Sequence, residues 1–114
     1  MALGAATHGS AHSGGAAPNA PVRFDLLTFA GDGAYGAGGT AAFEAYVQAA
    51  LGQAVTVLAV LDADTTGYVK RYDITNDKLM VFYCTNNAGA QGPLIEDTTA
   101  NQSGRTYSVI VISV

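Results

Sequence analysis

Apolar runs dominate the second half of the chain and predict β-strands. Residues 55–61 form a nearly uninterrupted apolar run, which an acidic turn at residues 62–67 ends. A run of this kind suits a strand that is buried on both faces, so we expect it at the centre of a sheet. Residues 105–114 form a second run, rich in valine and isoleucine, and we expect this final segment to be paired inside the sheet.

A β-hairpin is predicted between these two runs. Residues 68–74 and 78–84 have strand composition, and the connection at 75–77 contains Asn and Asp, which tolerate turn conformations. The polar stretch 85–104 is predicted to be a loop, with a brief strand at 94–95. Three side chains of the first hairpin strand share one face: Tyr68, Lys70 and Tyr72.

The first half of the chain predicts one strand, one loop and one helix. Residues 22–30 read as a strand with Phe24, Leu26 and Thr28 on one side. Residues 31–39 contain five glycines and are loop-forming, and no Lys-Ser or Lys-Thr pair follows them as a phosphate-binding loop requires. Residues 40–52 predict a short helix with Thr40 as its N-cap and Gly52 at its end. Its inward face is expected to consist of Phe43, Val47, Ala50 and Leu51.

Residues 1–21 differ from the rest of the chain. They contain no charged residue and almost no large apolar side chain except Leu3 and Met1. Such a segment buries too little area to offset the entropy cost of ordering it, about 1–2 kcal/mol per residue. We therefore expect an extended arm that is held by a partner's surface. Fully extended, it would reach about 70 Å, enough to bridge subunits.

Together these elements predict an all-β fold, a small antiparallel β-sandwich or jelly-roll-like barrel with one short helix. The expected organisation is an extended N-terminal arm over residues 1–21 and a β-sandwich body over residues 22–114. A length of 114 residues allows one domain and excludes a multidomain enzyme.

The charge content narrows the classes of partner. Charged residues make up only 12% of the chain and hydrophobic residues 49%, so an ordinary charged coat cannot cover the whole surface. The net charge is −4 and the five basic residues are scattered, which argues against nucleic-acid binding. No apolar run approaches the ~20 residues of a membrane span, and the N-terminus lacks the features of a signal peptide.

No arrangement of residues predicts catalysis or a cofactor. His8 and His12 have a helical metal-pair spacing, but Gly9, Gly14 and Gly15 disfavour a helix there. Asp62 and Asp64 are suitable ligands for a hard cation, although a turn between strands requires similar residues. The single cysteine, Cys84, ends an apolar strand, where a buried thiol is expected. We therefore expect a protein that is not an enzyme and binds no cofactor or metal.

Six tyrosines exceed what a core of this size needs, and Tyr is favoured at interfaces because it combines apolar area with a hydroxyl. Tyr68 and Tyr72, with Lys70 between them, form a candidate surface patch. An equally supported alternative is that these tyrosines cover an edge of the sandwich.

Several segments resemble small virion structural proteins of tailed bacteriophages. They are the Gly-rich turn at 34–39 before the helical segment 41–51, the strand 67–73 (GYVKRYD), the strand 78–82 (KLMVF) and the terminal valine/isoleucine strand. The resemblance covers residues 31–114. Within that group, the chain is similar to capsid decoration, or cement, proteins. The resemblance implies a β-sandwich or jelly-roll body over the joints between capsid subunits, with terminal arms that reach neighbouring subunits.

The resemblance implies a virion location on the capsid surface after synthesis in the host cytoplasm. The expected partners are the major capsid protein and further copies of the chain, as a dimer or trimer. The alternative function is a glycan-binding module on a virion or tail, which would use Tyr68 and Tyr72 with Asn86, Asn87 and Gln91. The candidate partner-contacting residues are Leu3, His8, His12, Pro18, Pro21, Arg23, Tyr68, Lys70 and Tyr72.

Overall fold

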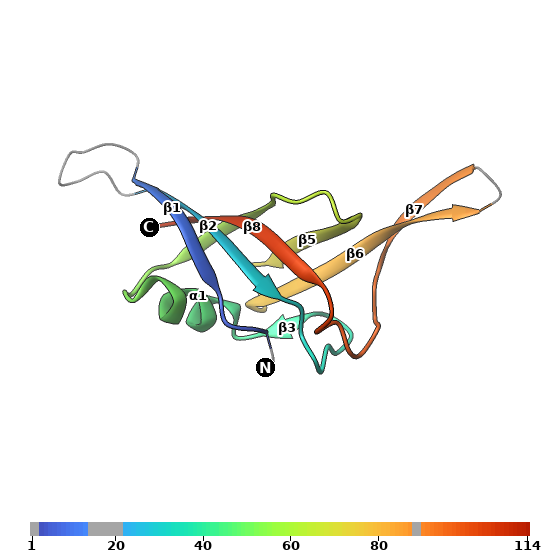
Figure 1. Ribbon diagram of the computed structural model, residues 1–114, viewed down its shortest axis with the longest axis horizontal. Helices are drawn as coiled ribbons and strands as arrows, with labels where there is room; N and C mark the ends of the chain where they lie inside the picture. Colours follow the sequence, from blue (N-terminus) through green and yellow to red (C-terminus); the bar gives the residue numbers. More distant parts are fainter. Residues whose placement is uncertain (1–2, 14–21, 88–89) are drawn as a thin grey trace.

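The computed structural model describes residues 3–13, 22–87 and 90–114, which form two antiparallel sheets and one helix (Figure 1). The first sheet has the strand order β1-β2-β8-β4, and the second has the order β3-β6-β5 with β7 also paired to β6. The elements are β1 (Thr7–Ser13), β2 (Arg23–Ala30), β3 (Thr40–Ala41), α1 (Phe43–Leu51), β4 (Val57–Asp62), β5 (Tyr68–Asp73), β6 (Lys78–Asn87), β7 (Ala90–Glu96) and β8 (Thr106–Ser113).

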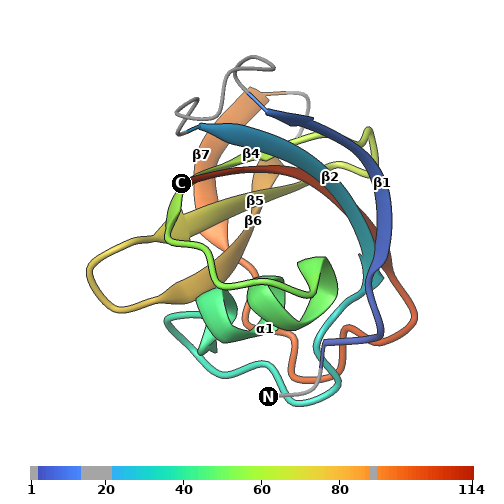
Figure 2. The same cartoon turned by 90° about the vertical axis from the view of Figure 1, so that its left-hand side faces the viewer.

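The two sheets curve around one core, and α1 lies across one end of it (Figure 2). Alternate residues of β2 and β8 point into this core, as the two-residue period of a strand requires. Fully buried side chains come from both sheets and the helix, and they include Leu27, Phe43, Val47, Tyr107 and Val109. The structure confirms the all-β class with one short helix.

The predicted hairpin is present, since β5 and β6 pair in antiparallel register from Tyr68 opposite Tyr83 to Asp73 opposite Lys78. The final strand β8 lies between β2 and β4, as expected for a segment paired inside a sheet. The region predicted as a loop with a brief strand at 94–95 contains more strand than that. There β6 and β7 form a two-stranded ribbon that projects from the body (Figure 1).

The helix has the predicted end and inward face but a different start. Gly52 has φ 72°, which glycine adopts readily, and its N–H donates to the Gln48 carbonyl. Thr40 is not the N-cap, because it lies in β3 and its hydroxyl donates to Asp32 at 2.7 Å. Instead Asp77, in the β5–β6 turn, accepts the Glu44 N–H at 2.8 Å.

The glycine-rich segment before the helix packs closely against β6. Gly39 has φ 108°, and a Cβ at this position would lie 2.7 Å from the Leu79 carbonyl oxygen. Only glycine fits both the backbone conformation and this approach. The segment is therefore a packing element rather than a ligand-binding loop.

The expectation that 55–61 forms a central strand is wrong. β4 lies at the edge of its sheet, and Leu58 and Leu61 are 42% and 50% exposed. A nearly continuous apolar run does not distinguish a strand buried on both faces from one whose second apolar face is exposed.

The N-terminal segment differs from the expected arm. Residues 7–13 form β1, which pairs along β2, and Leu3 and Ala6 pack against the core. An edge strand gains backbone hydrogen bonds without needing large side chains, so small residues suffice. The boundary expected at residue 21 therefore does not separate residues 3–13 from the body. Pro18 and Pro21 lie outside the described residues.

Candidate interaction surface

The outward side of the first sheet is apolar across three neighbouring strands. Phe24 and Leu26 of β2 lie opposite Ile112 and Ile110 of β8. On the other side of β8, Ala59 and Leu61 of β4 lie opposite the same two isoleucines. Directly opposed residues share a face of an antiparallel sheet. We call this set the outer apolar face: Phe24, Leu26, Ala59, Leu61, Ile110 and Ile112.

This face is open to solvent and carries no charge. Phe24 is 40% exposed, Leu26 37% and Leu61 50%, and Leu58 is also exposed at the adjoining bulge of β4. The next row toward the far end of the strands contains Thr28 and Ser108, whose hydroxyls are hydrogen-bonded at 2.9 Å. Antiparallel strands with one face in water normally alternate apolar and polar residues. Here both faces are apolar, so the outer one is suited to contact another protein.

Phe24 and Leu26 share one side of β2, as predicted, but the sequence pattern predicts an interface at tyrosines instead. The signal for the outer apolar face is present in β8, where Ile110 and Ile112 alternate with the buried Val109 and Val111. When the side chains on both faces of a strand are apolar, the pattern favours packing against other groups on both faces.

The proposed tyrosine patch does not lie on the surface. Tyr68, Lys70 and Tyr72 share one face, as predicted, but that face points toward the core, and Lys70 is only 1% exposed. The strand has its apolar Val69 and charged Arg71 on the opposite side. The glycan-binding alternative therefore loses its aromatic surface. The backbone of Asn86, Asn87 and Gln91 lies in the β6–β7 ribbon.

The Lys70 ammonium is enclosed by three oxygen acceptors. It donates to Asp62 Oδ1, Asp64 Oδ2 and the Tyr68 carbonyl, each at 2.7 Å, and it lies 4.8 Å from the centre of the Tyr107 ring. An ammonium has three donors, and all three are used. Asp62 and Asp64, considered above as cation ligands, thus hold a protein cation.

Asp64 remains ionised in this environment. Burial alone would raise the pKa of its carboxyl, but hydrogen bonds from Lys70, the Ser108 N–H and Thr66 outweigh burial and lower the pKa to about 2. A carboxylate this acidic cannot act as a general acid near neutral pH. The Lys70 cluster links the end of β4 and the β4–β5 turn to β5 and β8.

A buried carboxylate joins β1 to β2. Asp25 is fully buried, and it accepts hydrogen bonds from Arg23 Nε at 2.8 Å and from His8 Nε2 at 2.8 Å. Burial raises the pKa of Asp25, but the hydrogen bonds from Arg23 and His8 outweigh it and hold the pKa below its usual value. His8 and Arg23, two of the candidate partner-contacting residues, thus bind Asp25 of the same chain. The side chain of His12 is outside the described part.

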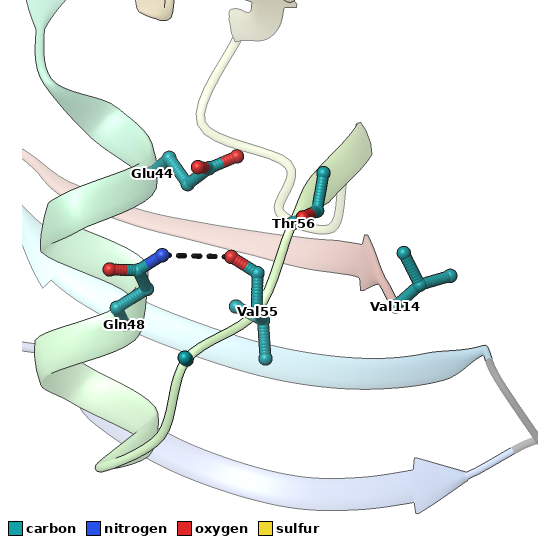
Figure 3. Close-up of a pocket in the computed structure, with 6 residues that line it drawn as sticks. Glu44, Gln48, Val55, Thr56 and Val114 are labelled. Atoms are coloured by element: carbon teal, nitrogen blue, oxygen red, sulfur yellow. Dashed lines mark hydrogen bonds between the residues drawn. The ribbon is translucent and has the colours of Figure 1, made fainter.

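A shallow hollow of about 220 Å³ lies between α1 and the segment before β4 (Figure 3). Two hydrogen bonds cross it: Gln48 Nε2 donates to the Val55 carbonyl at 2.9 Å, and Glu44 Oε2 accepts the Val57 N–H at 3.0 Å. Figure 3 shows the Gln48 amide turned toward Val55. These contacts join α1 to the segment before β4.

The residues that the structure describes contain neither a metal-binding cluster nor a membrane-spanning helix. Within them, no group of three or more His, Cys, Asp or Glu side chains is placed to hold a metal ion. In the same residues, no helix is both long enough and apolar enough to span a bilayer. Cys84 is exposed, so the expectation of a buried thiol is wrong: it lies where β6 extends past the end of its pairing with β5.

Comparison with known proteins gives no match: no family model fits the chain, and no curated protein and no solved structure is significantly similar to it.

Proposed function

We propose that this protein is a structural component of a bacteriophage virion that binds the outside of the capsid and stabilises the shell. The observation that carries the proposal is the outer apolar face, an uncharged surface that spans β2, β8 and β4. The resemblance of residues 31–114 to decoration proteins of tailed phages supports the same function.

The size of the face favours a repeating partner over a single strong one. None of its six side chains is more than half exposed, so it offers on the order of a few hundred Å². A lasting one-to-one complex buries about 800 Å² on each partner. Many copies that bind a lattice gain stability together from contacts that are individually modest.

The polar groups support a non-catalytic role. The buried Lys70 and Asp25 and the half-buried Asp64 are all held by partners within the chain. These pairs keep the inside of the sandwich in one arrangement, and they leave the protein's available surface for protein contact. We propose the major capsid protein as the main partner and the capsid surface as its location.

The proposal is tested by capsid binding. Wild-type protein should co-sediment with capsids purified without it and should raise the temperature at which they open. Quantitative mass spectrometry of virions should find hundreds of copies per particle. A variant with Phe24→Ser and Leu61→Ser should bind capsids more than about tenfold more weakly, because each change removes apolar area from the contact.

The matched control is Ile74→Ser. Ile74 is 58% exposed but lies in the β5–β6 turn, away from the outer apolar face, so this variant should bind capsids as the wild type does. Circular dichroism verifies that all variants are folded. Absence from virions, a few copies at the tail, or unchanged binding by the double variant would contradict the proposal.

A further inference from the structure

β1 and residues 3–6, which precede it, occupy a binding site on the body that is built by residues far from them in sequence. The Gly4 N–H donates to the Ala30 carbonyl at 3.0 Å, and the Tyr46 hydroxyl of α1 donates to the Gly4 carbonyl. His8 Nε2 reaches Asp25 at 2.8 Å, and the backbone of β1 pairs along β2. We call this site, formed by the β2 edge, Asp25 and Tyr46, the β1 seat.

The contacts of β1 and of residues 3–6 in the seat are mostly hydrogen bonds. Of residues 3–8, whose side chains are described, none is fully buried, and only Leu3 and Ala6 pack against the core. Backbone pairing and the two side-chain contacts depend on the sequence of the strand and on its direction. They do not depend on which copy of the chain supplies it.

The connection from β1 to β2 is the longest of the three hairpin connections. Four residues, 74–77, join β5 to β6, and two residues, 88–89, join β6 to β7. Nine residues, 14–22, separate β1 from β2. Hairpin connections of two to five residues enforce pairing within the chain. Nine residues do not, and at full extension they span about 30 Å.

That span matches the width of the molecule. The two shorter dimensions of the protein are 27 and 25 Å, so an extended connection reaches the same edge of a copy lying alongside. On a lattice that holds copies side by side, a neighbouring seat has a high effective concentration. An identical strand in an identical seat exchanges without loss of any contact.

We propose that β1 is an exchangeable strand that a copy of this chain inserts into the β1 seat of a neighbouring copy. The partner is a second copy, and the contact links adjacent copies without a new interface. The inference rests on the proposed function for the side-by-side arrangement of the copies.

The test uses the opposed pair Thr7 and Thr28. Opposed residues of an antiparallel pair have Cα atoms about 4.5–5.5 Å apart, which a disulfide can bridge. In a Cys84→Ser background, one variant carries Thr7→Cys and another carries Thr28→Cys. The two are mixed, unfolded in urea, refolded together and added to capsids. After mild oxidation, non-reducing electrophoresis should show disulfide-linked dimers that contain one chain of each variant.

The control is the double variant Thr7→Cys/Thr28→Cys at high dilution, which should close the disulfide within one chain and verify the geometry. Capsid binding is read separately, by sedimentation of the same samples. If the protein binds capsids but the mixture yields no mixed dimer, the exchange is overturned and the proposed function stands. If it does not bind capsids, the mixture is oxidised in concentrated solution, and a lack of mixed dimers there also overturns the exchange.

Discussion

Lys70 is a charged side chain whose burial would be strongly unfavourable without partners. A lysine is almost never fully buried unless it is paired, because moving its charge from water into the protein is costly. Here two carboxylates and one carbonyl surround it, and the Tyr107 ring lies beside it. The cluster joins the β4–β5 turn to β5 and, through Asp64 and the Ser108 N–H, to β8.

Removal of the Lys70 charge should therefore destabilise the fold. Lys70→Met keeps an unbranched side chain but leaves Asp62 and Asp64 facing each other without the cation. We expect a loss of about 3–5 kcal/mol in the free energy of unfolding, measured by urea denaturation. Arg71→Met is the matched control, because Arg71 is exposed on the opposite side of the same strand. Equal losses in the two variants would contradict the structural role of the cluster.

Acid should weaken the protein through the same cluster. The pKa of Asp64 is about 2 in the folded chain and about 3.9 in an unfolded one, so the unfolded state takes up the proton first as the pH falls. The stabilisation is complete above pH ~4 and is lost between pH ~4 and ~2, with a contribution of about 2 kcal/mol. In urea titrations across this range, Asp64→Asn should show a shallower pH dependence than the wild type. Parallel curves for the two proteins would refute this assignment.

The start of α1 depends on a residue from another element. Ala42, before the helix, has φ 57° and offers no side-chain cap, and Asp77 supplies the missing acceptor to the Glu44 N–H. Asp77 also accepts the Tyr72 hydroxyl at 2.9 Å. Asp77 in the β5–β6 turn thus holds both the start of α1 and the core-facing Tyr72.

Asp77→Ala should remove both contacts and lower the free energy of unfolding by about 1–2 kcal/mol. Asp77 has φ 53°, a conformation that Asn tolerates better than Ala does. Asp77→Asn keeps an acceptor and should lose clearly less. Thermal unfolding of the two variants measures the difference, and the prediction fails if Asn and Ala at this position are equally destabilising.

Local signals in the sequence were sufficient for elements whose contacts are local. The turn composition at 75–77 gave the β5–β6 hairpin, and Gly52 gave the end of α1. Long-range contacts could not be inferred in this way. The start of α1 depends on Asp77, 33 residues beyond Glu44.

β1 shows the same limit most clearly. Its composition predicts no strand, because the groups that hold β1 in place belong to β2 rather than to β1 itself. The outer apolar face was divided between segments that are far apart in sequence, and only the order β2-β8-β4 brings Leu26, Ile110 and Leu61 into one row.

At the scale of the whole molecule, the outer apolar face and the β1 seat lie on the same sheet. β2 contributes Phe24 and Leu26 to the outer face and its backbone edge to the seat. A strand received from a neighbour would therefore support the sheet whose outer side is proposed to contact the capsid. Lattice binding and strand exchange would strengthen each other, since each holds β2 in the conformation that the other requires.

A body without its N-terminal strand should accept that strand from solution. A variant that lacks residues 1–13 leaves the β2 edge unpaired and deprives Asp25 of His8, so its melting temperature should fall below that of the full chain. A synthetic peptide of residues 1–13 is expected to bind only the folded body and should restore the melting temperature in a dose-dependent way. At a peptide concentration 100 times its Kd, the free energy of unfolding should rise by about 2.7 kcal/mol. A peptide with His8→Ala should restore less, because Asp25 then keeps only Arg23 as a partner. The prediction is contradicted if the truncated body melts at the full-chain temperature, or if the peptide does not change its melting temperature.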